Sequence, residues 1–382
     1  RRVGEDGWEL SIKALIDNAD CSHKARFTLI DADGNEKASA IADLRPIISA
    51  KLPVEDPVLW NGRKNPYLYT VRCEIFDSTT QEVTDNIDIR TGLREYHIDS
   101  HKGFFLNGEH IKLQGVSRHQ DRENMGNAIT EKQHAEDVKI ILDVGANSVR
   151  LAHYQQNSYF YDLCDESGLL VWAEVPVISR FSPKRNENAE QQLVELIKQN
   201  YNHPSIFCWG IENEITIAGS ASKKLITFLK HMHKVARHLD PTRYTTCAQL
   251  TMCPVNSPLN HITDIIGYNH YYGWYMGSCD EINNWLDEWH RENPEGKLCL
   301  SEYGAEGITK YHSDSPVQGD YSEDYQAIYH EHYIKSINER DWLWGSYVWN
   351  MFDFGSASRN EGGVRGRNNK GLVTFDRKTK KD

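Results

Sequence analysis

The sequence predicts a multidomain chain in which an immunoglobulin-like β-sandwich over residues 1–92 precedes a (β/α)8 TIM barrel over residues 93–382. Three observations lead to this prediction. Apolar residues alternate with period two in the N-terminal part, strand and helix patterns then alternate, and polar side chains follow the later strands. Eight strand–helix units over roughly 290 residues are the size and order typical of such a barrel.

Period-two alternation in the N-terminal part indicates half-buried strands. It is clearest at 8–15, 25–30 and 68–75. Asp33 and Gly34 are turn-forming residues between two such runs, so they predict a hairpin. Several short strands at this spacing favour a sandwich of two sheets.

Beyond about Leu93, apolar strand candidates alternate with helical patterns. The strand candidates are 111–118, 146–152, 169–175, 206–212, 244–249, 264–270, 297–302 and 343–351. The helical patterns are 131–143, 158–167, 189–200, 222–238, 281–291 and 322–337, and no helix is clear at 250–263. A doubly wound sheet is the alternative, but its Gly-rich phosphate-binding turn would come early. The Gly-rich stretch at 362–366 comes late, and no helical pattern follows it.

Composition narrows the function classes. The net charge of −12 argues against a general nucleic-acid-binding protein, which would carry a basic surface. No run of eighteen apolar residues occurs, so we expect no membrane-spanning helix. No HExxH or CxxC pattern supports a zinc site, and we expect neither a metal nor a cofactor. The 10 Trp and 19 Tyr supply core, and their number also suits a site that binds flat ligand faces.

Two glutamates stand out because each follows a short apolar run at the predicted carboxyl end of a barrel strand. Glu214 ends the run that begins at Ile206, and Glu302 ends the run that begins at Lys297. The active site of such a barrel lies at this end, and paired carboxylates there suit acid/base and nucleophilic chemistry on a glycosidic bond. Ion pairing at the barrel rim is the alternative for each glutamate. Asn213 favours the catalytic interpretation, because an amide beside the carboxylate can bind a sugar hydroxyl.

Most of the other strand ends also carry polar or aromatic groups. These are Arg118 to Asp121, His153 with Tyr154, Glu174, Asn269 to Tyr272, and Trp349 with Asn350. A lone histidine at a strand end is more often structural than a ligand contact. His119 and His153 are predicted on adjacent strands facing one mouth, which favours contact with a polar ligand. Trp349 is either a core residue or an apolar floor under a sugar ring.

These motifs resemble glycoside hydrolase family 2 over nearly the whole chain. Residues 209–214, Trp-Gly-Ile-Glu-Asn-Glu, are similar to the family's acid/base motif, and residues 301–305, Ser-Glu-Tyr-Gly-Ala, are similar to its nucleophile motif. The resemblance implies that Glu214 is the general acid/base and that Glu302 is a nucleophile hydrogen-bonded by Tyr271, with retention of configuration. The sugar-contacting positions that the resemblance implies are His119, Asp121, His153, Asn213, Asn269, Tyr271, Trp349, Asn368 and Lys370.

Within the family the sequence favours an exo-β-galactosidase, with a β-glucuronidase as the alternative. Residues 117–122 and 369–376 resemble the shorter bacterial β-galactosidases, whereas residues 269–275 resemble the glucuronidases. The large magnesium-dependent galactosidases have Glu-x-His metal ligands after the third strand and a galactose-binding histidine after the nucleophile. Residues 174–180 lack the first feature and Gly304-Ala305 replaces the second, so the resemblance implies no required magnesium.

The C-terminal motif does not separate these two activities. Asn368 and Lys370 fit the Asn-x-Lys carboxylate-binding pattern of glucuronidases, which galactosidases of this group share. The additional arginine of the glucuronidases falls at Val364, and Arg365 is one position off.

A non-catalytic carbohydrate-binding barrel is the alternative from another class, but it predicts a missing carboxylate and both are present. We expect a carbohydrate substrate, with no nucleic-acid or membrane partner, and the sequence leaves a homo-oligomer of the full-length protein open. The family's usual jelly-roll domain before the sandwich has no counterpart in these residues, so we expect a catalytic fragment of weakened activity. Location stays open between the bacterial cytoplasm and the periplasm.

Overall fold

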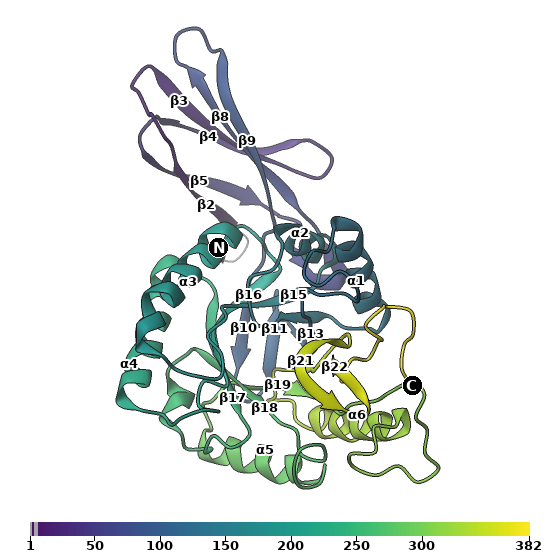
Figure 1. Cartoon of the computed structure of the whole chain (residues 1–382). Coiled ribbons are helices and arrows are strands. Elements are labelled where there is room, and N and C mark those ends of the chain that lie inside the picture. The colour runs from purple at the N-terminus through teal and green to yellow at the C-terminus, as the bar shows by residue number, and fades with distance from the viewer. Residues whose placement is uncertain (1, 4–6) are drawn as a thin grey trace.

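The computed structural model describes residues 2–3 and 7–382, and its N-terminal part is a β-sandwich (Figure 1). One sheet has the strand order β1-β2-β5 and the other the order β4-β3-β8-β9. The bounds are β1 Arg2–Val3, β2 Gly7–Leu15, β3 His23–Ile30, β4 Glu36–Asp43, β5 Ile47–Glu55, β8 Tyr69–Asp77 and β9 Val83–Thr91. Every second residue of β5 is buried, because alternate side chains of a strand point to opposite faces. Phe27 and Leu52 are among the residues that fill the space between the sheets, and the predicted sandwich is confirmed.

A closed barrel of eight parallel strands follows, in the order β13 to β20. Its strands are β13 Leu113–Ser117, β14 Ser148–Leu151, β15 Leu170–Glu174, β16 Ile206–Asn213, β17 Tyr244–Leu250, β18 Ile265–Asn269, β19 Leu298–Tyr303 and β20 Gly345–Val348. Each lies within two residues of a predicted strand, except that β20 is shorter at both ends and leaves Trp349 beyond it. The strands are buried on both faces, which explains why they are continuous apolar runs in the sequence. The predicted barrel is therefore confirmed.

In the part of the chain that the structure describes, six α-helices surround the barrel (Figure 1). They are α1 Glu131–Asp143, α2 Ser158–Ser167, α3 Asn186–Asn200, α4 Lys223–Leu239, α5 Glu281–Glu292 and α6 Glu323–Asn338. The link between β17 and β18 carries only a short 3₁₀ turn at Pro258–His261, in agreement with the missing helical pattern there. None of the helices in the described part of the chain is long and apolar enough to cross a bilayer.

A small antiparallel sheet closes the barrel at the amino ends of its strands, and the sequence patterns did not predict it. Its strands are β10 Tyr96–Asp99, β11 Gly103–Leu106 and β12 Glu109–Ile111. Phe104 packs edge-on against Phe207, which in turn packs against Trp344 inside the barrel. The boundary predicted at residue 92 falls in the link between β9 and β10. Because this end is plugged by aromatic side chains, ligands have access to the barrel only at the opposite mouth.

A hairpin of β21 Phe354–Glu361 and β22 Val364–Asn368 follows the last barrel strand, shown in yellow in Figure 1. Its turn uses Gly362 and Gly363, both at positive φ, where glycine has no steric penalty. The late Gly-rich stretch of the sequence is therefore a hairpin turn.

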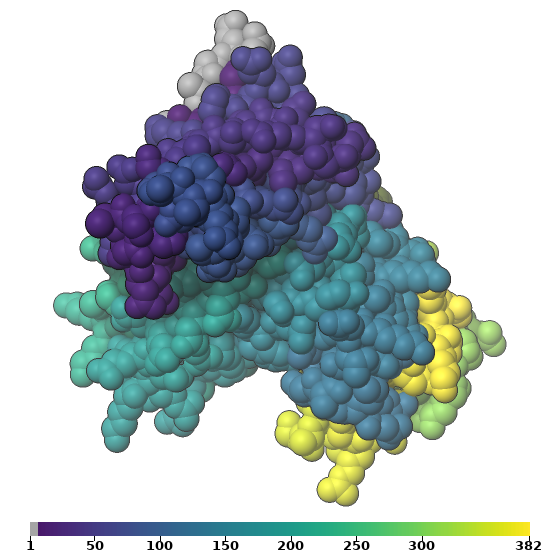
Figure 2. Space-filling model, turned by 90° about the horizontal axis from the view of Figure 1, so that it is seen from above, coloured from purple at the N-terminus to yellow at the C-terminus, as the bar shows by residue number. Residues whose placement is uncertain are grey.

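The sandwich lies directly against the barrel, as the space-filling view in Figure 2 shows. Two short strands, β6 Trp60–Asn61 and β7 Asn65–Pro66, flank the contact. The indole of Trp60 donates to the carbonyl of Asp165 at 2.9 Å. Arg63 donates to the carbonyl of Ala146, so the contact joins the sandwich to the starts of the barrel strands.

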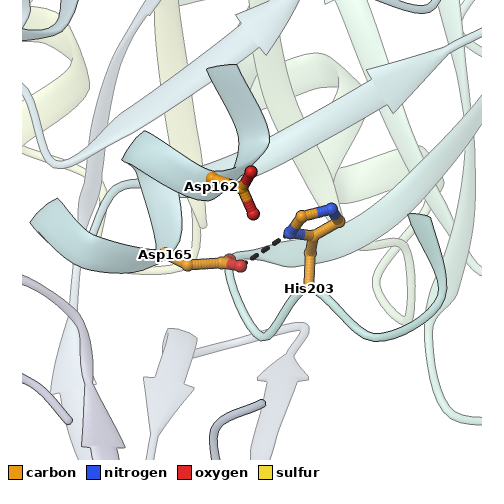
Figure 3. Close-up of side chains that lie close together, drawn as sticks. All are labelled: Asp162, Asp165 and His203. Atoms are coloured by element: carbon orange, nitrogen blue, oxygen red, sulfur yellow. Dashed lines mark hydrogen bonds and ion pairs between the residues drawn. The ribbon is translucent and has the colours of Figure 1, made fainter. Parts of the chain in front are cut away.

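Asp162, Asp165 and His203 lie together at this junction (Figure 3), with one ligand atom of each within 4.8 Å of the others. His203 Nδ1 is 2.6 Å from Asp165 Oδ2, and the other oxygen of Asp165 accepts from the Ser205 amide. Asp162 is 3.3 Å from Arg90 of β9. The three side chains are thus engaged in contacts that tie α2 to the loop between α3 and β16 and to the sandwich.

Gly168 gives a test of this packing. It caps α2 at φ +74°, and a Cβ added there would lie 2.2 Å from the backbone of Gly62. We expect Gly168→Ala to lower the free energy of unfolding by about 3 kcal/mol, because it adds a backbone clash to positive-φ strain. Gly145 follows α1 at φ +88° with nothing within 4 Å of its added Cβ, so Gly145→Ala, at about 1 kcal/mol, isolates the strain. If denaturant unfolding showed equal losses of unfolding free energy in Gly168→Ala and Gly145→Ala, the close approach of Gly168 to Gly62 would be contradicted.

Candidate active site

A cavity of about 570 Å³ occupies the open mouth of the barrel. Its lining residues come from the carboxyl ends of several strands and from the hairpin. They include His153, Asn213, Glu214, Tyr271, Tyr275, Glu302, Trp349, Arg359 and Asn368. The structure therefore brings together seven of the residues singled out in the sequence: both glutamates, His153, Asn213, Tyr271, Trp349 and Asn368. His119, Asn269 and Lys370 are not lining residues, but each contacts a lining side chain directly: Trp349, Glu214 and Tyr275 respectively. Asp121 is not a lining residue either, and it accepts from the Gly355 amide of the hairpin.

Glu214 is the first residue after β16. Its backbone has φ +48°, a conformation unusual for a non-glycine residue, and its amide donates to the Ala248 carbonyl at 2.8 Å. Asn269 Nδ2 donates to Glu214 Oε1 at 3.1 Å. Burial, and next the negative charge of Glu302, raise the pKa of Glu214 to about 7. A carboxyl with this pKa still holds its proton near neutral pH and can act as an acid.

Glu302 on β19 has a different environment. Arg150 Nη1 donates to its Oε1 at 2.9 Å, and the hydroxyl of Tyr271 donates to its Oε2 at 2.6 Å. The contact from Tyr271 is the one expected from the sequence. Both donors stabilise negative charge on this carboxylate, so the two glutamates differ in the way that separates a nucleophile from an acid.

Arg150 lies fully buried in β14 and connects most of this site. Its guanidinium binds Glu174 through Nε at 3.0 Å and Nη2 at 3.2 Å. It also donates to Asn213 Oδ1 at 2.7 Å and to the Ser301 carbonyl at 3.0 Å. Burial alone would lower the pKa of Arg150, but Glu174 and Glu302 raise it above its ordinary value. The pKa of Glu174 reflects the same contact. Burial acts to raise this pKa, but Arg150 and His153 hold it below its ordinary value.

The amides of Asn213 and Asn269 are oriented by a chain of hydrogen bonds. Ser301 Oγ donates to Asn269 Oδ1 at 2.7 Å, so the nitrogen of Asn269 faces Glu214 and Asn213. Asn213 Oδ1 accepts from both Arg150 and Asn269. Its Nδ2 is therefore the atom of this amide that remains for a ligand in the cavity.

One wall of the cavity is aromatic. His153 stacks on Trp349 with ring centroids 5.0 Å apart and an angle of 19° between the planes. His153 Nδ1 is 2.6 Å from Glu174, which leaves Nε2 towards the cavity, 4.0 Å from Glu302 Oε1. His119 contacts Trp349 edge-on, and burial lowers the pKa of His119 to about 3, so this imidazole is neutral.

Asp121 lies next to the hairpin. Its Oδ2 accepts from the Gly355 amide at 2.9 Å, whereas Oδ1 is buried and finds no partner among the residues described. Burial raises the pKa of Asp121.

A cluster of charged side chains lies at the hairpin side of the cavity, and most of it was not predicted. Lys370 Nζ is 3.1 Å from Glu306 Oε1 and 2.6 Å from the hydroxyl of Tyr275. Arg359 of β21 donates to the same two groups, each at 2.8 Å. We call Lys370, Arg359, Glu306 and Tyr275 the cation cluster. Burial acts to raise the pKa of Glu306, but the charges of Lys370 and Arg359 hold it below its ordinary value.

Sequence reasoning missed Arg150, Glu306 and Arg359 as site residues. A signal existed for Arg150, since an arginine inside the buried run Ser148–Leu151 needs a partner in the barrel. Glu306 lies four residues after Glu302 in the sequence, and this spacing alone does not predict a site residue. Arg359 sits in a polar hairpin, and only the folded contact distinguishes it from surface arginines. The described residues that cluster as candidate metal ligands, at the sandwich junction and around His312, do not line the cavity.

Comparison with known families agrees with this architecture. The model for the TIM barrel domain of glycosyl hydrolases family 2 matches residues 98–382, and a second model of glycosyl hydrolases family 2 matches residues 3–94. The chain belongs to glycoside hydrolase family 2.

Its relatives carry two different activity names. A β-glucuronidase of Bacteroides fragilis is 43% identical over 346 residues, covering 87% of this chain and 48% of that protein. The crystal structure of an FMN-binding β-glucuronidase from Faecalibacterium prausnitzii L2-6 has a TM-score of 0.96 and 46% identity, over 100% of this chain and 59% of that one. A putative β-galactosidase from Bacteroides fragilis has a TM-score of 0.93 and 38% identity, over 100% of this chain and 58% of that one. The chain thus spans about half the length of the curated relatives it matches.

The arginine at the centre of the site gives a prediction for stability. Arg150→Gln leaves two buried carboxylates without their cation, so we expect it to lower the free energy of unfolding by about 3–5 kcal/mol. Arg72 binds Asp88 at 2.7 Å on the sandwich surface, where both side chains are exposed. Arg72→Gln is the matched control, and its unfolding curve in denaturant should overlay that of the parent protein. Similar curves for Arg150→Gln and the parent would show that the ion-pair network is not needed for folding.

Proposed function

We propose that this chain carries the catalytic site of a retaining exo-β-glucuronidase that hydrolyses terminal β-D-glucuronides. The observation that carries the proposal is the pairing of two carboxylates in unlike environments beside a cluster of cations. The glucuronidases among the relatives support the sugar specificity, and they favour it over the β-galactosidase preferred from the sequence. Since the chain spans about half of those relatives, the activity of the whole protein is part of the proposal.

In the first step, a carboxylate oxygen of Glu302 attacks the anomeric carbon while Glu214 donates its proton to the glycosidic oxygen. The bond between the anomeric carbon and that oxygen breaks, and the aglycone leaves as a neutral alcohol. In the second step, Glu214 takes a proton from water as the water oxygen attacks the anomeric carbon, and Glu302 is released. The pKa of about 7 for Glu214 suits a group that must serve as acid and then as base.

The remaining sugar contacts follow from the arrangement of the mouth. Asn213 offers its amide nitrogen to a hydroxyl next to the anomeric carbon, a contact that strengthens as positive charge develops on the sugar. His153 and Trp349 form an aromatic wall for the sugar ring. Arg150 and Tyr271 fix the carboxylate of Glu302, so that its attack needs little reorganisation.

The cation cluster suits the carboxylate that distinguishes a glucuronide from a galactoside. Two cations, Lys370 and Arg359, share one buried carboxylate, Glu306, so the cluster holds a surplus positive charge facing a cavity lined by Arg359 and Asn368. Glu361 also binds Arg359, but its side chain is 41% exposed, where solvent screens it. A sugar carboxylate satisfies the surplus charge, whereas the hydroxymethyl group of a galactoside does not.

The pH dependence tests the role of Glu214. For a phenyl glycoside, which needs a protonated leaving group, kcat/KM should fall about tenfold per pH unit above about 7, because the acid form of Glu214 is lost. Glu214→Gln should remove this alkaline limb while keeping kcat/KM for a 2,4-dinitrophenyl glycoside, because kcat/KM reports the first step and this leaving group needs no proton.

Glu212 supplies the matched control. It is fully buried two residues earlier, accepts hydrogen bonds from Gln249 and the Ile215 amide, and burial raises its pKa to about 8. Glu212→Gln should keep the limb. If the alkaline limb disappeared in Glu212→Gln and persisted in Glu214→Gln, the acid would be Glu212 and the assignment to Glu214 would be wrong.

Substrate preference tests the cation cluster. Arg359→Gln should lower kcat/KM for 4-nitrophenyl β-glucuronide at least tenfold, because a charge-assisted contact to the sugar carboxylate is lost, with little change for 4-nitrophenyl β-galactoside. Arg365→Gln, an exposed arginine of β22, should leave both values unchanged. A parent protein that prefers the galactoside would return the assignment to a β-galactosidase. An Arg359→Gln variant that loses both activities equally would contradict the contact between the cation cluster and the sugar carboxylate.

A further inference from the structure

Glu212 is a buried carboxyl group to which the two-step displacement gives no role. It lies in β16, two residues before Glu214, and its side chain is closed off from solvent. In the described part of the chain its partners are hydrogen-bond donors, and none of them is a cation. Burying a carboxyl group without a cation is unfavourable, so its place in a barrel strand needs a physical reason.

Three donors converge on this carboxyl group. Gln249 Nε2 donates to Oε1 at 2.8 Å, and the backbone amide of Ile215 donates to Oε2 at 3.1 Å. The thiol of Cys247 is the third partner, and burial raises the pKa of this thiol, so that it keeps its proton. Glu212 is therefore held on one side by β17 and bound on the other side to the peptide that follows Glu214.

The Ile215 amide links Glu212 to the proposed acid. Glu214 has φ +48°, a conformation that is unfavourable for a residue with a Cβ and persists only where the surrounding contacts hold it. The amide of Glu214 is fixed by the Ala248 carbonyl at 2.8 Å. The amide on its other side is fixed by Glu212 at 3.1 Å. These two hydrogen bonds hold both peptide planes that flank Glu214, and thereby the direction in which its side chain leaves the backbone.

Loss of the acceptor for Ile215 would therefore move the acid. Ile215 is only 2% exposed, so water does not readily replace a protein acceptor for its amide. A buried amide without a partner is unfavourable, and the peptide would rotate towards another acceptor. Such a rotation changes the backbone angles of Glu214 and takes its carboxyl group away from the 3.1 Å contact with Asn269.

We propose that Glu212 is a positioning residue for Glu214: by accepting a hydrogen bond from the Ile215 amide, it holds the acid in the orientation from which it protonates the leaving group. The proposal rests on the proposed function for the role of Glu214. In this role Glu212 supplies an acceptor in a fixed place rather than a charge, so an amide of the same length should replace it.

Gln249 allows this replacement. Its Nε2 binds Glu212, whereas its Oε1 is buried and has no partner among the residues described. In Glu212→Gln the new amide oxygen can accept from Ile215, and the new amide nitrogen can donate to the Gln249 oxygen once that amide is turned over. Burial raises the pKa of Glu212 to about 8, so a neutral group already predominates at this place near pH 7. Glu212→Met has a similar length but offers no oxygen to the Ile215 amide.

Kinetics with two leaving groups test this role. For a phenyl glycoside, which needs the proton of Glu214, Glu212→Met should lower kcat/KM about tenfold or more. For the 2,4-dinitrophenyl glycoside of the same sugar the change should stay within about twofold, because this leaving group needs no proton. Glu212→Gln should stay within about twofold of the parent protein for both substrates. A residue that only maintains the core would affect both substrates alike, because both need the same cavity and the same nucleophile.

An equal loss for both leaving groups in Glu212→Met, or no loss for either, would overturn the proposal. The same loss for the phenyl glycoside in Glu212→Gln would also overturn it. If Glu212→Met does not fold, Gln249→Met gives the test, because it keeps Glu212 and removes the donor that orients it. Gln249→Met should lower kcat/KM about threefold for the phenyl glycoside alone, and no change or an equal change for both leaving groups would contradict the role of Glu212.

Failure of the proposed function gives a different result. If the parent protein hydrolyses galactosides and not glucuronides, the same two leaving groups are compared on the galactoside. If it hydrolyses no glycoside, crystal structures of the variants test the positioning without catalysis. Glu214 should keep its positive φ and its contact with Asn269 in Glu212→Gln and lose both in Glu212→Met. An unchanged Glu214 in Glu212→Met would then overturn the proposal.

Discussion

The buried guanidinium of Arg150 is the interaction on which the rest of the site depends. It holds Glu302, Glu174 and Asn213 around one positive charge inside the barrel. A buried carboxylate without such a partner is driven towards its protonated form. Glu302 receives this partner and Glu214 does not, so burial raises the pKa of Glu214 while Glu302 keeps two donors to its charge. A two-step displacement needs one carboxylate as nucleophile and one carboxyl group as acid. This difference between Glu302 and Glu214 follows from the position of Arg150 on β14.

A second asymmetry runs across the mouth of the barrel. The hairpin side carries Lys370 and Arg359 around the buried Glu306, whereas none of the described residues lining the cavity between the β16 and β17 loops is Asp, Glu, Lys or Arg. Glu214 and Glu302, the two carboxyl groups proposed to be catalytic, line the cavity at this mouth. The anionic sugar of the proposed substrate matches this arrangement in one orientation only, because the reverse orientation would place the anion away from both cations. Under the proposed function, specificity and positioning therefore arise from the same distribution of charge.

Periodicity predicted the sandwich, the eight barrel strands and all six helices, because these elements are fixed by local burial patterns. Glu214 and Glu302 were predicted as site residues because they lie at the carboxyl ends of apolar runs, which the sequence also shows directly. The sheet β10–β12 and the hairpin β21–β22 were missed, since short strands with mixed polarity carry no clear period. Of the cation cluster only Lys370 was predicted. The position of the glucuronidases' additional arginine is Val364 in this sequence, whereas the structure places Arg359 on the same carboxylate as Lys370, that of Glu306. Such contacts join residues that sequence spacing does not relate.

The central claim is that Glu302 attacks the sugar, and covalent trapping tests it most directly. A 2-deoxy-2-fluoro-β-glucuronosyl fluoride slows release of the glycosyl-enzyme, so the intermediate accumulates and its peptide can be identified by mass spectrometry. The account predicts one added 2-fluoroglucuronosyl group on the peptide that contains Glu302, and none in Glu302→Gln. Labelling at Glu214, Glu306 or Glu174, or hydrolysis that continues in Glu302→Gln, would contradict it.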